Sequence, residues 1–351
     1  MWQTHEVINQ VPPLRGWNPY ASDAALQAAV EREGAGWHAE ALARQGGTLG
    51  SAETLELAAR AERRPPELVS HDARGHRIDR VVFDPAWTAL LQLLYRAGTH
   101  ASAWLEPRPG AHVARAAAFF LHGQIEAGSL CPVTMTFASI PVLQREPALF
   151  AGLADRLRAR DYDARELPLT AKRSAMIGMG MTEKQGGSDL RGISTRARAL
   201  GAGGRGAQYA LVGHKWFFSA PGCDAHLVLA RTDAGPSCFF LPRWLPDGSR
   251  NPVRIQRLKD KLGNRSNASA EVEFEDALGV LVGEEGRGIA TIMEMAAQTR
   301  LDCVLGSAAL MRRALVEAIH HARHRSAFGR PLAAQALMRN LLAELALESE
   351  A

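Results

Sequence analysis

Gly178-Met-Gly-Met-Thr-Glu-Lys-Gln-Gly-Gly-Ser-Asp189 places small residues and two hydroxyl groups, those of Thr182 and Ser188, in one short loop. Glycine has no Cβ and a wide range of φ values, so such a loop lets the backbone approach a planar, phosphate-bearing ligand closely. A second stretch, Gly213-His-Lys-Trp-Phe-Phe-Ser219, sets aromatic rings beside a hydroxyl, which suits stacking on a heteroaromatic ring and bonding its edge. Taken singly, the first stretch is also typical of a tight connection and the second of a core strand. Their occurrence in order within one β-prone region favours a ligand site.

Length and composition place the chain among ordinary globular proteins. Its 351 residues allow two or three domains, and 46% of them are hydrophobic and 22% charged. The formal charge of +4 permits contact with phosphates but does not imply it. The four cysteines have no CxxC spacing, which argues against a zinc ribbon or a disulfide scaffold and fits a reducing cytosol. No signal peptide and no run of 18 apolar residues is visible, so we expect a cytoplasmic protein without a membrane span.

Three regions of different pattern predict an α+β multidomain fold. Residues 1–175 are mainly helical in pattern, and residues 176–284 hold short β-prone segments separated by turns, which predicts a middle antiparallel β-barrel or sandwich. Residues 285–351 return to the helical period and end within a second helix. One and a half helices do not bury their own apolar faces, so we expect an incomplete C-terminal helical domain and a truncated chain.

Local signals fix several helix boundaries. Ser22 and Ser51 are expected N-caps, the latter for a helix over 52–63 that two prolines must stop. Asp84-Pro85 is a cap followed by proline at the first helical position. One very long helix is expected over 289–325, and another over about 111–127.

Two further patterns invite a functional interpretation but favour a plainer one. Gly201-Ala-Gly-Gly-Arg-Gly206 satisfies the dinucleotide-binding spacing, but β-prone residues flank it on both sides, so we expect a hairpin loop. His320, His321 and His324 share a helical region without an acidic neighbour at ligand spacing. We interpret them as a basic helix end favoured by the helix dipole and predict no metal site.

The two opening motifs resemble those of the acyl-CoA dehydrogenase superfamily. Thr182-Glu183 followed by Gly187-Ser188-Asp189 is similar to the family's Thr-Glu, spacer, Gly-Ser-Asp signature. Gly213–Ser219 is similar to Gly-x-Lys-x-Trp-Ile-Thr, with Phe217 at the Trp position and Ser219 at the Thr position. The resemblance implies an FAD cofactor. The residues that it implies for cofactor binding are Met179, Gly180, Met181, Thr182, Gly187, Ser188, Phe217, Phe218, Ser219, Arg325, Phe328 and Gln335.

Within that set the resemblance implies distinct roles. Met179 and Met181 line the flavin and Thr182 bonds its edge, while Ser188 takes the pyrophosphate. The ring of Phe217 stacks on the isoalloxazine and the hydroxyl of Ser219 bonds N5, with the neighbouring Trp216 compensating for the smaller ring.

A third motif implies a site shared between subunits. Arg325-Ser-Ala-Phe328-Gly329 resembles Arg-x-x-Phe-Gly, which in this family reaches the cofactor of a neighbouring subunit. Arg325 would meet the pyrophosphate as a forked cation, and Phe328 and Gln335 would meet adenine. The chain is therefore expected to form a homo-oligomer, at least a dimer and in this family usually a tetramer.

Other stretches narrow the resemblance to the DNA alkylation response branch of the family. They are Met1-Trp-Gln-Thr-His5, 126–137 and 258–269. Members of this branch are flavoproteins with weak or uncertain acyl-CoA dehydrogenase activity. Their C-terminal extension binds double-stranded DNA, so DNA is expected as a partner only through a segment that this chain lacks.

The motif for the catalytic base is missing. Acyl-CoA dehydrogenation needs a carboxylate to take the α-proton while a hydride moves to flavin N5. Some members place a Glu just before an Arg in the long helix, but here Thr299 precedes Arg300, and Ala297 stands where an acidic residue is usual. We therefore expect no catalytic residue in this chain, with Arg300 as a supporting group. An acyl-CoA-like compound remains the expected substrate class; an ordinary acyl-CoA dehydrogenase, a catalytically silent DNA-protecting flavoprotein and a non-functional fragment remain alternatives.

Overall fold

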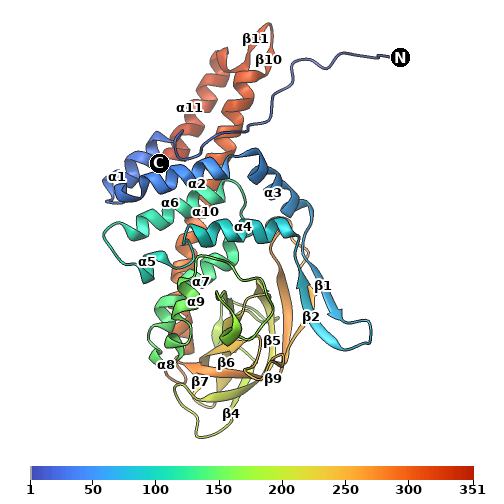
Figure 1. The fold of residues 1–351 in the computed structure, drawn as a ribbon, viewed down its shortest axis with the longest axis vertical. Coiled ribbons are helices and arrows are strands. Elements are labelled where there is room, and N and C mark those ends of the chain that lie inside the picture. The colour runs from blue at the N-terminus through green and yellow to red at the C-terminus, as the bar shows by residue number, and fades with distance from the viewer. Residues whose placement is uncertain (1) are drawn as a thin grey trace.

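A computed structural model describes residues 2–351, so Met1 of the N-terminal motif lies outside the described part. The molecule is elongated, with helices at one end and a twisted β-sheet structure at the other (Figure 1). The predicted α+β architecture, with helical N-terminal and C-terminal regions around a β middle, is confirmed. A single helix, α10 (Gly288–His324), runs from the sheet to the far end of the helical layer (Figure 1).

The N-terminal helices begin where short polar side chains offer caps. Ser51 Oγ accepts the Thr54 N–H at 3.2 Å and Asp84 Oδ1 accepts the Ala86 N–H at 2.9 Å, as predicted. The predicted cap Ser22 is off by one residue: Asp23 caps the first helix, because the Ser22 hydroxyl donates to a backbone carbonyl instead. The helices are α1 (Ala24–Arg32), α2 (Ala39–Leu49), α3 (Ala52–Arg63), α4 (Pro85–Arg96), α5 (Ser102–Leu105), α6 (Ala111–Gly123), α7 (Leu130–Leu143), α8 (Pro147–Ala151) and α9 (Ala154–Arg158), with 3-10 turns η1 (Gly36–His38) and η2 (Leu169–Ala171).

One β-hairpin interrupts the helical region and was not predicted. Strands β1 (Glu67–His71) and β2 (Arg77–Val82) pair antiparallel. Their turn is held by Asp72 Oδ1, which accepts the backbone N–H groups of Arg74 and His76. The turn residues Asp72 and Gly75 between two short segments that contain β-branched residues are the signal that could have revealed it.

The middle region is a seven-stranded sheet in the order β3-β5-β4-β6-β7-β9-β8, and the additional pairing of β5 with β9 closes it into a barrel. Most pairs are antiparallel, as predicted, but β3 pairs in parallel with β6, and β4 meets β6 in parallel at one position, so the sheet is mixed. Nothing in the local pattern distinguishes the two directions, because both pairings use the same alternation of side chains. The strands are β3 (Ile177–Gly180), β4 (Arg196–Ala199), β5 (Gln208–Ser219), β6 (Ala225–Thr232), β7 (Gly235–Pro242), β8 (Val253–Leu258) and β9 (Ser269–Val282), with the 3-10 turn η3 (Leu190–Gly192) before β4.

The remaining elements lie at the far end of α10. A two-residue-strand hairpin, β10 (Ser326–Ala327) and β11 (Arg330–Pro331), follows α10, and the turn η4 (Leu332–Ala334) leads into α11 (Ala336–Glu350). Helix α11 packs on α10 but buries none of its residues. None of the helices in the described part of the chain is long and apolar enough to cross a membrane.

Candidate functional site

A β-bulge shapes the end of β5, where the second motif lies. Between Lys215 and Phe218, β5 advances three residues while its partner β9 advances two. Both of these side chains are buried, and the two residues between them, Trp216 and Phe217, are more exposed. Bulges re-aim side chains and are frequent beside functional sites. Here the bulge leaves Phe217 52% exposed, with the partly exposed Ser219 two residues further on.

The aromatic rings of the two bulge residues, Trp216 and Phe217, lie on the same side of β5, because both contact one lysine. Lys259 Nζ lies 3.3 Å from the centroid of the Trp216 ring and 4.7 Å from that of Phe217. Such contacts are attractive because the face of an aromatic ring is electron-rich. The structure therefore presents two rings, an ammonium group and a hydroxyl together on the outside of the barrel.

Two of the predicted cofactor residues, Phe218 and Gly180, are packed in the barrel core. Phe218 is 1% exposed and stacks on His226 inside the barrel, with 3.9 Å between ring centroids. Gly180 lies opposite, and a Cβ there would stand 2.6 Å from the Phe218 ring. Gly178 is equally constrained, since its Cβ would meet the His226 ring at 2.3 Å. Strand alternation turns the Phe218 side chain inward, where it packs against Gly180, and the contact of these two residues with the cofactor stays a prediction.

The glycine-rich loop is fastened to β5 by a buried carboxylate that sequence reasoning missed. Glu183 Oε1 accepts from Lys215 Nζ at 2.7 Å, and both side chains are fully buried. The same carboxylate accepts the N–H and hydroxyl groups of Ser194 and Thr195 at 2.6–3.1 Å. The signal was present, since the first motif contains an acid, Glu183, and the second contains a base, Lys215.

This network also sets the charge state of the carboxylate. Burial alone would raise the pKa of Glu183, but the ammonium of Lys215 and the hydrogen bond from Thr195 more than offset it and hold the pKa well below its usual range. Glu183 is therefore an ionised anchor, with its acceptor oxygens already occupied.

The loop itself folds back over Thr182. Glu183 and Gly186 exchange backbone hydrogen bonds at 3.0–3.2 Å, and the Thr182 carbonyl accepts the Trp216 N–H at 2.8 Å. Thr182 thus lies beside the bulge of β5, partly exposed. Ser188 is exposed beyond the turn. The structure therefore brings Thr182 and two partly exposed methionines, Met179 in β3 and Met181 just after it, to β5, the strand that carries Phe217 and Ser219.

Gly213 of β5 packs closely against Thr195, which lies just before β4. Its φ is +149°, and a Cβ would lie 2.5 Å from the Cα of Thr195. We expect Gly213→Ala to lower the free energy of unfolding by about 1–3 kcal/mol, because both the backbone conformation and the overlap are unfavourable. Urea unfolding measures it. The matched control is Gly192→Ala in η3, close in sequence to Thr195, where nothing lies within 4 Å of the added Cβ. Equal stability of the two variants would contradict this contact.

The third motif lies at the opposite end of the molecule. Arg325, Phe328 and Gln335 are on or beside the hairpin at the far end of α10, whereas the bulge of β5 is at the sheet end (Figure 1). A helix of 37 residues is roughly 55 Å long. Phe328 is 94% exposed. Within one chain, the structure does not bring these three residues together with Ser188 or Phe217.

Helix α10 offers no free carboxylate beside Arg300. The Thr299 hydroxyl donates to the Ala296 carbonyl at 2.9 Å, and Arg300 is exposed. Asp302, two residues on, is 3% exposed and is held by Arg115, with 2.7 Å from Nη2 to Oδ2. A carboxylate bound in this way is a structural anchor rather than a free base.

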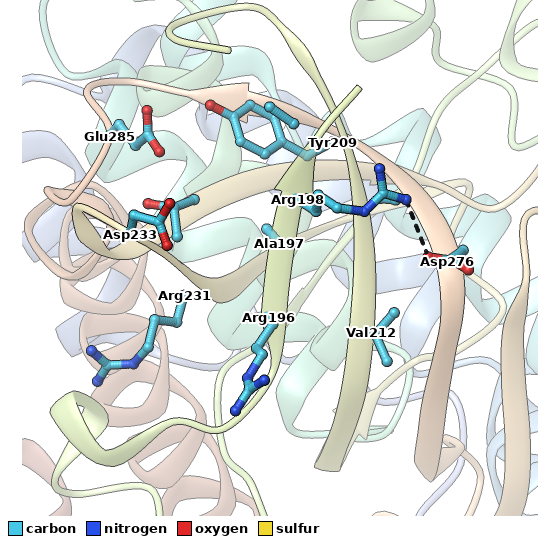
Figure 2. A pocket seen from close by; sticks show the side chains of 12 residues that line it. Arg196, Ala197, Arg198, Tyr209, Val212, Arg231, Asp233, Asp276 and Glu285 are labelled. Carbon is cyan, nitrogen blue, oxygen red and sulfur yellow. Dashed lines mark ion pairs between the residues drawn. The ribbon is translucent and has the colours of Figure 1, made fainter. Parts of the chain in front are cut away.

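A hollow of about 750 Å³ lies elsewhere, along β4, β5 and β6. Figure 2 shows Arg196, Arg198 and Arg231 around it, with Asp233, Asp276 and Glu285 among them. Figure 2 marks one ion pair among these residues, that of Arg198 with Asp276 at 3.9 Å. Both side chains of this pair are largely exposed. None of the motif residues lines this hollow, so its mixed charge describes a solvated face.

The structure also places the two other sequence patterns, the glycine-rich stretch 201–206 and the three histidines of α10. Gly201–Gly206 forms the loop between β4 and β5, as expected, and no helix follows it. His320 Nε2 is 2.7 Å from the Pro12 carbonyl oxygen, and His324 Nδ1 is 2.8 Å from the His320 carbonyl oxygen. In residues 2–351, no group of three or more His, Cys, Asp or Glu side chains is placed to hold a metal ion.

Comparison with known families agrees with the fold and the motifs. Residues 178–277 match the acyl-CoA dehydrogenase middle domain and residues 286–351 match the acyl-CoA dehydrogenase C-terminal domain. Residues 9–164 match the adaptive response protein AidB N-terminal domain. The chain belongs to the acyl-CoA dehydrogenase family, and this membership supports FAD as its cofactor.

Individual relatives narrow the position within the family. The chain is 57% identical to AidB of Escherichia coli (strain K12) over 99% of its own length and 64% of that protein. It is 30% identical to acyl-CoA dehydrogenase family member 11 of Caenorhabditis elegans, over 95% of this chain and 55% of that protein. The crystal structure of Caenorhabditis elegans ACDH-11 in complex with C11-CoA superposes with a TM-score of 0.88 at 28% identity, covering 99% of this chain and 60% of that one. The chain thus spans less than two thirds of the length of these relatives.

Proposed function

We propose that the chain binds FAD against the outer side of the β5 bulge. The observation that carries this proposal is the bulge itself. It turns Phe217 outward beside Ser219, at the place where the glycine-rich loop, held by Glu183, meets β5. Half-exposed aromatic rings on a rigid strand suit stacking on an isoalloxazine ring, and the hydroxyl of Ser219 suits its polar edge. Thr182, Met179 and Met181 border the same place on β3 and the loop.

The phosphates of the cofactor would lie along the loop beyond Thr182. Gly187 leaves no room for a side chain, since its Cβ would stand 2.5 Å from Thr182 Oγ1, and the next residue, Ser188, is exposed. In this proposal Arg325, Phe328 and Gln335 of a second copy complete the site. Their position at the far end of α10 supports a contribution in trans, because they cannot serve the site of their own chain.

Bound FAD would accept a hydride from a CH–CH group of an acyl-CoA-like or alkylated substrate. This chain's own part in that reaction is to position the ring system through Phe217 and Ser219 and to hold the loop through Glu183. The DNA alkylation response role is proposed from the resemblance to AidB, and homo-tetramer formation from the family.

A silent flavoprotein that protects DNA is the second candidate. The observation that favours it is the lack of a carboxylate beside Arg300, together with the occupied state of Asp302. Anaerobic addition of an acyl-CoA separates the two: bleaching of the flavin absorbance supports a dehydrogenase. If the chain is an ordinary acyl-CoA dehydrogenase, the acyl-CoA should bleach the flavin absorbance equally with and without DNA.

We expect Ser188→Ala to weaken FAD binding by about 1–3 kcal/mol, because it removes a hydrogen bond to a charged phosphate. Titration of FAD into the purified apoprotein, followed by flavin fluorescence, measures the change. Ser249→Ala is the control, since its hydroxyl bonds only Asp247 in a distant turn. Wild-type FAD affinity in the Ser188 variant would argue against the proposed path of the phosphates.

A further inference from the structure

The segment before α1 is fastened to the hairpin that carries Arg325. Asn9 uses both ends of its side-chain amide on one residue: Oδ1 accepts the Ser326 N–H at 2.8 Å and Nδ2 donates to the Ser326 carbonyl at 2.8 Å. In addition, Arg325 Nη1 donates to the Asn9 carbonyl. The segment makes a further contact about one helical turn earlier in α10, where His320 lies close to the Pro12 carbonyl oxygen. In Figure 1 this segment passes alongside the upper part of α10.

The identity of Asn9 follows from its geometry. Its φ is +57°, a left-handed conformation in which asparagine is among the best tolerated residues other than glycine. The amide gives one donor and one acceptor at the same end, so it pairs with a backbone N–H and C=O as a neighbouring strand would. Aspartate has the acceptor without the donor, and glycine has the conformation without the amide.

The hairpin needs such support because it is very short. Its strands have two residues each, and Phe328 and Gly329 form the turn with φ of +53° and +76°. Hairpins of this size are marginal by themselves. The other fixed points within the chain are the Leu332 N–H, which donates to the Arg325 carbonyl at 2.9 Å, and Gln335 Nε2, which donates to the Ala327 carbonyl at 3.1 Å.

We propose that Asn9 is a positioning residue for the cofactor site of a second copy of this chain. The proposal rests on the proposed function, in which Arg325 meets the pyrophosphate of FAD. Arginine has five N–H donors in a fixed fork. The Asn9 carbonyl accepts from one nitrogen, which holds the guanidinium beside the segment and leaves its other N–H donors available to a phosphate. The two bonds to Ser326 hold the residue that follows Arg325, and so fix the backbone from which the Arg325 side chain extends.

The experiment compares FAD affinity and apoprotein stability in single and double variants. Asn9→Gly removes the amide and keeps the left-handed backbone available. Asn9→Gly is expected to raise the Kd for FAD about three- to tenfold, the worth of the lost hydrogen bonds. The unfolding midpoint of the apoprotein should stay at that of the control Gln10→Ala, whose side chain bonds only the Ile8 carbonyl. In the Arg325→Ala background, Asn9→Gly should change FAD affinity no further.

The outcomes separate the two proposals. If Arg325→Ala weakens FAD binding and Asn9→Gly does not, the positioning role is wrong and the shared cofactor site stands. If Arg325→Ala also binds FAD like the wild type, the shared site is wrong and the positioning role falls with it. A full additional loss of affinity in the double variant would likewise overturn positioning through Arg325.

Discussion

Lys215→Met is expected to lower the free energy of unfolding by about 3–5 kcal/mol, because it leaves the Glu183 carboxylate buried without its cation. Both side chains of the pair are fully buried, so water does not replace the lost interaction. Urea unfolding at pH 7 measures the effect. The matched control is Lys184→Met, which removes an exposed cation in the same loop and should cost little.

A double variant tests the same pair from the other direction. Replacing a buried ion pair by apolar residues is often close to neutral, whereas breaking it is costly. Lys215→Met combined with Glu183→Leu should therefore be more stable than Lys215→Met alone, although the bonds to Ser194 and Thr195 are lost. If Lys215→Met is as stable as Lys184→Met, the pair does not hold the loop.

The second large effect is a loss of folding stability at acidic pH, caused by three buried histidines. Burial lowers the pKa of His100 and of His226 to about 3 and that of His122 to about 4. The unfolded chain takes up these protons below about pH 6.5 and the folded chain does not, so stability is full above that pH and falls as the pH drops toward 3–4. From pH 7.5 to 5.0 the expected loss is about 2 kcal/mol for each histidine, about 6 kcal/mol together.

Denaturant unfolding between pH 7.5 and 5.0 measures this slope. His226→Phe keeps a ring stacked on Phe218 and removes one titrating group, so it should reduce the slope by about one third. The exposed His71→Phe is the control and should keep the wild-type slope. An unchanged slope in His226→Phe would show that His226 is not buried in its neutral form.

Local sequence signals were sufficient to predict helix ends, because these depend on residues that are neighbours in the chain. Ser51 and the Asp84-Pro85 pair fixed helix starts because an N-cap and a first-turn proline act within a few residues of themselves. The long helix over 289–325 was found within a residue at each end, as Gly288–His324, because its apolar repeat is sustained over ten turns.

Long-range structure was not predictable in the same way. Glu183 and Lys215 are 32 positions apart in sequence, and only strand pairing brings them together. The bulge in β5 depends on its register with β9, so the sequence alone did not show that Phe217 is exposed while Phe218 is buried. In the proposed cofactor site, a hairpin at one end of α10 and a strand at the other meet only when a second copy of the chain is considered.

The most direct test of the proposed cofactor site is complementation between two defective variants. Ser188→Ala impairs the loop side of the site and Arg325→Ala impairs the hairpin side, so each variant alone should bind FAD weakly. In a sample that exchanges subunits, random pairing gives about a quarter of the sites both native halves, if each site takes one half from each copy. FAD titration of the mixture should then show about a quarter of the sites with wild-type affinity. Weak binding at every site, as in the two parent variants, would contradict a cofactor site shared between copies of this chain.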